Sequence, residues 1–196
     1  MKPIRNLPDN YHQVARIDLK ENIKLGVALN LAGIPLFFAA GWFFLQIISW
    51  IRPDAAELWG VLGGFRNLVI VLVGIFIIVF IHEMVHGLFF WFFTRERPRF
   101  AFKLAYAYAA APDWFIPRNQ YLVVGLSPLI VLSLVAILLF IFLPPYGVGL
   151  VLVLASFNVA GAVGDLAISG WLLMKKSDLL INDSGDAATI FGPETI

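Results

Sequence analysis

The stretch FIHEMVHG, residues 80–87, decides the fold and the chemistry that we expect of this chain. Positions four apart on a helix share a face, so His82 and His86 can direct both imidazoles at one metal ion. Glu83 lies beside them as a candidate general base. The segment around this motif, residues 68–93, contains no other charged side chain. Polar groups in so apolar a helix are costly and are usually functional.

The composition indicates an integral membrane protein. Of the 196 residues, 60% are hydrophobic and 14% are charged, and the mean hydropathy is +0.85. A soluble domain has about half apolar and about a quarter charged residues. The net charge of +1 and the scattered basic residues predict no nucleic-acid partner. Because the chain has no cysteine, a metal ion must be held by His, Asp, Glu or Asn.

Four apolar segments are long enough to cross a bilayer as helices: residues 25–51, 68–93, 121–143 and 147–174. The sequence therefore predicts an all-α integral membrane protein with a four-span domain over residues 25–176. Residues 1–24 read as a polar extension, not as a signal peptide, because the first apolar segment is long and lacks a small-residue cleavage site. The tail, residues 177–196, is polar and acidic, and we expect it to be loosely ordered.

Between the second and third spans, residues 100–108 alternate large apolar side chains with alanine or lysine. This period of two predicts a short interfacial β-hairpin. One interpretation is an aromatic anchor at the membrane surface. The other is an edge strand that pairs with an extended substrate, in which Tyr106 and Tyr108 contact that substrate.

The distribution of Lys and Arg predicts the orientation. Five lie in residues 1–24, five in residues 94–120 and two just after the fourth span, against two in the remaining loop. Cytosolic loops carry the excess of positive charge. We therefore expect both termini in the cytosol, in what reads as a bacterial cytoplasmic membrane.

The four spans contain no Lys or Arg, and their only groups that change charge near neutral pH are His82, Glu83, His86 and Asp165. A catalytic zinc site takes three protein ligands and keeps one open position. His82, His86 and Asp165 supply that number, which leaves Glu83 as general base. His86 and Asp165 also lie at similar depths, about seven and ten residues before the ends of their spans.

Asn158 precedes Asp165 by about two helical turns and would share nearly the same face. It is a candidate substrate-binding residue, since its amide could hydrogen-bond a substrate backbone or a developing oxyanion. The alternative is a hydrogen bond between helices. Gly161 and Gly164 predict a close approach of the fourth helix to the second.

This set of residues predicts metal-assisted peptide hydrolysis. Zinc would polarise the scissile carbonyl, and Glu83 would take a proton from water and pass it to the leaving amine. The substrate would be a membrane protein or peptide, cut in an extended form near the cytosolic side of the bilayer.

The motif helix, the basic loop with its strand-like segment and the later Asn and Asp resemble the site-2 class of intramembrane zinc metalloproteases. They are more similar still to the small zincin-type membrane peptidases of a domain of unknown function, over residues 68–174. The resemblance implies His82, His86 and Asp165 as zinc ligands and Glu83 as the base. Two features of the site-2 class are missing: the prolines between its Asn and a Leu-Asp-Gly triplet, and a PDZ domain.

A second interpretation is a membrane metal-binding or transport protein that uses the same three ligands without chemistry. This interpretation assigns no role to Glu83, and transporters usually have more spans and internal repeats. Haem binding does not fit, because His82 and His86 lie on one helix face and cannot take both axial positions of one haem. A purely structural bundle would leave all four ionisable residues unexplained. The sequence does not indicate an oligomeric state.

Overall fold

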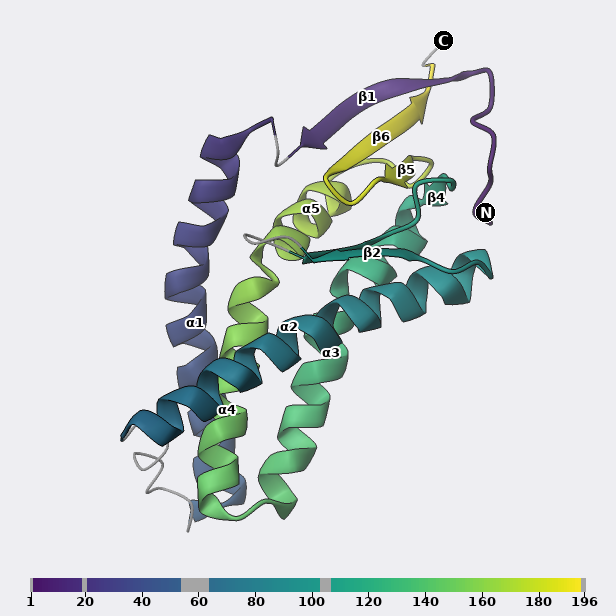
Figure 1. The fold of residues 1–196 in the computed structure, drawn as a ribbon. Coiled ribbons are helices and arrows are strands. Elements are labelled where there is room, and N and C mark those ends of the chain that lie inside the picture. The colour runs from purple at the N-terminus through teal and green to yellow at the C-terminus, as the bar shows by residue number, and fades with distance from the viewer. Residues whose placement is uncertain (1, 19–20, 54–63, 103–106, 195–196) are drawn as a thin grey trace. The chain divides into compact units, whose positions relative to one another are not determined.

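The computed structural model describes residues 2–18, 21–53, 64–102 and 107–194. It is mostly helical, as expected (Figure 1). The helices are α1 (Ile23–Ile51), α2 (Phe65–Thr94), α3 (Arg118–Phe142), α4 (Pro145–Gly161) and α5 (Val163–Leu173). Within the described residues, α1, α2 and α3 are long and apolar enough to cross a membrane. Helices α4 and α5, which are bent by 46° at their junction, make a fourth span if the pair crosses as one.

The expected fourth span is not one continuous helix. Helix α4 ends at Gly161 and α5 begins at Val163. Between them, the Ala162 N–H donates to the Asn158 carbonyl at 3.0 Å. Because of this break, Asn158 and Asp165 belong to different helices, so their spacing does not place them on one helix face. Asp165 lies instead in the first turn of α5.

A four-stranded antiparallel sheet, absent from the sequence expectation, joins the two ends of the chain (Figure 1). Its order is β1 (Tyr11–Asp18), β6 (Ala187–Pro193), β5 (Leu180–Asp183) and β4 (Ile116–Pro117). The expectation of a loosely ordered tail is therefore wrong, and the fold is helical with a small sheet and not purely α. Gly185, at φ +87°, makes the turn between β5 and β6, a conformation that glycine adopts without strain.

The β-hairpin expected after the second span is present. Strand β2 (Arg99–Phe102) pairs antiparallel with β3 (Ala107–Ala110). The Phe100 ring packs directly on α2 at Gly87, where a Cβ atom would collide with the ring and lie 3.2 Å from Pro98 Cγ. A glycine after His86 therefore lets the hairpin lie against the helix that carries the motif.

The chain divides into two compact units. The first comprises Met1–Ala28, Glu83–Ser127 and Gly164–Ile196, and the second comprises Leu29–His82 and Pro128–Val163. The core of the first unit packs the sheet against α3, α5 and the end of α2, through residues that include Phe90, Ile116, Val124, Leu172 and Ile190.

The second unit packs α1 against α3 and α4. Its core contains Phe44 and Phe140, whose rings meet edge to face at 5.9 Å. Gly33 of α1 lies against the backbone of α4, since a Cβ there would be 3.2 Å from the Ala160 carbonyl oxygen. Many large apolar side chains of these helices are exposed, Phe38 at 68% and Trp42 at 66% among them. This exposure suits helices that face lipid.

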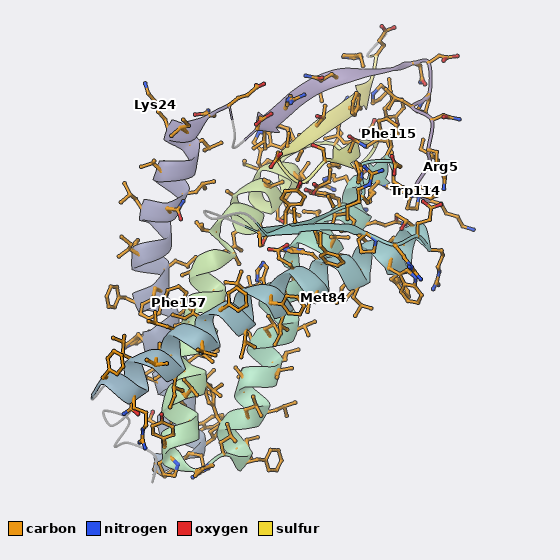
Figure 2. The ribbon with its side chains drawn as sticks, viewed as in Figure 1. Arg5, Lys24, Met84, Trp114, Phe115 and Phe157 are labelled. Carbon is orange, nitrogen blue, oxygen red and sulfur yellow. The ribbon has the colours of Figure 1, made fainter. Side chains whose placement is uncertain are left out.

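The N-terminal extension is anchored within the first unit, at the residue that precedes strand β4. Ile4 and Phe115 exchange backbone hydrogen bonds of 3.0 and 2.8 Å. Figure 2 shows Arg5 beside Trp114, with its guanidinium carbon 5.1 Å from the ring centroid. Arg5 also pairs with Glu96. The extension is thus part of the folded protein.

Candidate metal centre

One turn of α2 carries the three motif side chains. His82, Glu83 and His86 are all buried, with exposures of 9%, 9% and 8%. The boundary between the two units falls within α2: His82 belongs to the second unit and Glu83 to the first. The continuous helix therefore sets the spacing of the two imidazoles, as the sequence predicts.

His86 is held at one ring nitrogen by the backbone of α3. Its Nδ1 lies 2.9 Å from the Val124 carbonyl oxygen. A carbonyl only accepts hydrogen bonds, so Nδ1 must carry the proton and donate it. The other nitrogen, Nε2, faces Asp165 Oδ2 at 3.4 Å. His86 therefore presents Nε2 as the atom that can bind a metal.

His82 is held in the same way by α4. Its Nδ1 lies 2.9 Å from Asn158 Oδ1, so Nδ1–H donates to the amide oxygen and Nε2 is left for a metal. Metal-binding histidines commonly donate their second ring N–H to a fixed acceptor, which sets the tautomer and the ring orientation. Both histidines of this motif have that arrangement.

The three expected ligands come together. One ligand atom from each of His82, His86 and Asp165 lies within 4.8 Å of the others. Two imidazole nitrogens and one carboxylate oxygen form a donor set that suits catalytic zinc. The donor set and the two fixed Nδ1–H groups therefore fit zinc, the metal expected from the sequence.

Asp165 gives this group of ligands a more open side. Its side chain is 26% exposed, against 10% for that of His86. His86 lies eight residues before the end of α2, and Asp165 eight before the end of α5. At 1.5 Å per residue both are roughly 12 Å from those helix ends. The two residues are therefore equally far from the ends of their helices, and their depth in a membrane remains a prediction.

The other expected site residues have different surroundings. Glu83 is buried next to the ligands and is not one of the three, so its role as base remains a prediction. Tyr106 lies outside the described residues. Tyr108 is on β3, and its ring packs against the backbone of Gly185. Its contact with a substrate also remains a prediction.

The close helix contact expected at Gly161 and Gly164 is not present. A Cβ atom at either glycine would meet no atom within 4 Å.

A carboxylate of the C-terminal hairpin was missed. Asp183 Oδ2 accepts a hydrogen bond from the Tyr121 hydroxyl at 2.7 Å, and its Oδ1 accepts one from the Gly185 N–H at 2.8 Å. Desolvation raises the pKa of Asp183, although both hydrogen bonds oppose the shift. The charges of His86 and Asp165 also act on this pKa, so Asp183 lies near the ligands. The Asp-Ser-Gly turn was the signal in the sequence.

Comparison with protein families gives one match at this site. A family model described as "Putative zincin peptidase" matches residues 75–180, which include the motif helix, the hairpin and Asp165. No curated protein and no solved structure matches the chain.

If Asn158 orients His82, removing its amide should weaken metal binding without unfolding the protein. We expect Asn158→Ala to raise the zinc dissociation constant about 10–100-fold, the usual effect of losing such a partner, in a chelator-competition titration of the detergent-purified protein. Asn67→Ala is the matched control, because Asn67 is also buried in α2 but lies 15 residues before His82. Equal affinities in the two variants would contradict this role of Asn158.

Proposed function

Because the chain belongs to the family described as "Putative zincin peptidase", we propose that it is an intramembrane zinc metalloprotease. It hydrolyses peptide bonds of membrane-associated substrates near the cytosolic side of the bilayer. The observation that carries this proposal is the arrangement of His82, His86 and Asp165, in which both imidazoles are fixed at Nδ1 and present Nε2 beside a carboxylate. A helix bundle with a purely structural role does not require two imidazoles oriented beside a carboxylate.

The residues divide into ligands and a base. Zinc held by His82, His86 and Asp165 would supply Lewis-acid polarisation of the scissile carbonyl and an activated water. Glu83 accepts a proton from the attacking water and delivers it to the leaving amine.

Asn158 has a donor to spare for the substrate. Its Oδ1 accepts the proton of His82, whereas its Nδ2 is buried and has no hydrogen-bond partner among the described residues. A buried amide N–H that lacks a partner is destabilising. In the proposed complex it donates to a substrate carbonyl or to the oxygen that becomes negative during hydrolysis. One side chain would thus orient a ligand and bind the substrate.

The substrate is an extended segment of a membrane protein or peptide, because a helix hides its amide bonds. Strand β2 packs on α2 next to the motif through Phe100 and Gly87, and its pairing with β3 leaves the hairpin with free edges among the described strands. An extended substrate adds to such an edge through backbone hydrogen bonds. The orientation follows from the positive-inside rule, with both termini in the cytosol.

Glu83→Gln separates hydrolysis from metal binding. The amide keeps the size of the side chain but cannot take up the proton, so we expect cleavage of a membrane-embedded test substrate to fall about 10²–10⁴-fold while the zinc content stays at the wild-type level. The measurement is a gel-based cleavage assay in proteoliposomes, with zinc determined on the same samples.

A wild-type protein that binds zinc and cleaves none of a broad panel of membrane peptides would favour the second function, a membrane metal-binding or transport protein. Full activity in Glu83→Gln would show that another group is the base.

The edge-strand hypothesis predicts that Ala107→Pro slows cleavage. Proline lacks the N–H of a strand residue and disturbs pairing along the hairpin. We expect a higher KM for an extended membrane substrate and an unchanged zinc content, since Ala107 is not among the ligands. Unchanged KM and kcat would remove the hairpin from substrate binding.

A further inference from the structure

The carbonyl that orients His86 lacks the backbone N–H that would be its regular partner in an α-helix. In an α-helix the carbonyl of one residue accepts the N–H of the residue four positions later. For Val124 that residue is Pro128, which lies inside α3 and has no N–H to donate. The position of the proline thus frees one particular backbone oxygen, and it is the oxygen that lies 2.9 Å from His86 Nδ1.

Two side chains use this freed carbonyl. His86 Nδ1–H donates to it, and the Ser127 hydroxyl donates to it at 2.7 Å. A carbonyl oxygen has two lone pairs, so both are occupied. Val124, Ser127 and His86 are all buried, with exposures of 1%, 4% and 8%. A buried carbonyl must have a partner, and here the metal ligand itself is one of the two.

We infer that Pro128 is a positioning residue for the metal centre: by withholding its N–H from Val124, it keeps that carbonyl available to fix the His86 ring with Nε2 toward Asp165. This inference deepens the proposed function and rests on the zinc site described above. Proline also crowds the carbonyl four residues earlier and turns it away from the helix axis. Both effects direct the Val124 oxygen outward from α3.

Alanine at position 128 would reverse both effects. It supplies an N–H that competes for the Val124 oxygen and removes the ring that crowds it. The helix would gain a regular hydrogen bond, and alanine is the best helix former, whereas proline is the worst. A gain in helix regularity together with a loss of His86 orientation is a combination that a merely structural proline would not give.

The experiment compares Pro128→Ala with Pro35→Ala. Pro35 also lies inside a helix, α1, and leaves the Leu31 carbonyl without its helical partner, but α1 provides none of the three ligands. In the metal-free detergent-purified protein, the first readout is the imidazole Nδ1 proton of His86 by NMR, assigned through its loss in His86→Ala. The second readout is the zinc dissociation constant by chelator competition. The third is the thermal unfolding midpoint.

We expect Pro128→Ala to weaken or abolish the hydrogen-bonded Nδ1 resonance and to raise the zinc dissociation constant about tenfold or more, with no fall in the unfolding midpoint. Pro35→Ala should leave the resonance and the affinity as in wild type. An unchanged resonance in folded Pro128→Ala would overturn the inference. That readout needs no metal, so it separates this inference from the proposed function, which fails if wild-type protein binds no zinc.

Pro128→Leu repeats the test with another residue that restores the N–H. If both Pro128 variants fail to fold while Pro35→Ala folds, the proline is required for the fold and the inference is also overturned. Loss of the His86 resonance in Pro128→Ala and Pro128→Leu alike would support it.

Discussion

The hydrogen bonds at the two Nδ1 atoms are the constraint on which the site depends. Buried polar groups are stable only when they are hydrogen-bonded. An imidazole in an apolar helix cannot form that hydrogen bond with bulk water, so it needs a partner within the protein. His86 is paired with the backbone of α3 and His82 with an amide of α4. Each pairing fixes one ring nitrogen as a donor and so leaves the other for a metal. The need to satisfy these polar groups and the need for pre-oriented ligands are met by the same contacts.

Interruptions of regular helix lie next to these contacts. Pro128 frees the Val124 carbonyl in α3, and after the break at Ala162 helix α5 begins at Val163, two residues before Asp165. Irregular backbone at membrane depth is tolerated where it is buried in protein or lines a cavity. In this chain each interruption lies near a residue that we propose as a ligand: Pro128 near the carbonyl that holds His86, and the helix break near Asp165.

The parts of the site that depend on local geometry could be predicted from the sequence. His82, Glu83 and His86 lie within one helical turn, so the helix period alone places them together, and Asp165 was identified as the only other acidic residue within the spans. The sequence allowed for Asn158 a hydrogen bond between helices, and that bond is present, with His82 as the partner. The partner itself could not be named, because spacing along one helix does not show which residues of two separate helices meet. The Val124 carbonyl belongs to the backbone, so the residue type at position 124 does not indicate its role. Pro128 could have indicated it, because a proline inside a helix leaves the carbonyl four residues earlier without its N–H partner.

The sheet was missed for a different reason. Strand β1 pairs with β6, and Tyr11 lies opposite Pro193, so the strands that complete the sheet come from opposite ends of the chain. No local window contains that pairing, and each strand alone is short and partly polar. The polarity of the tail does not indicate weak order, because half of the side chains of each strand face away from the core.

The central claim is that His82, His86 and Asp165 hold zinc. It is tested most directly by elemental analysis of freshly purified wild-type protein beside His86→Ala and Asp165→Ala. The account predicts stoichiometric zinc in the wild type and loss of that zinc in both variants. A metal-free wild type whose stability is unchanged by a chelator, or full zinc content in both variants, would contradict it.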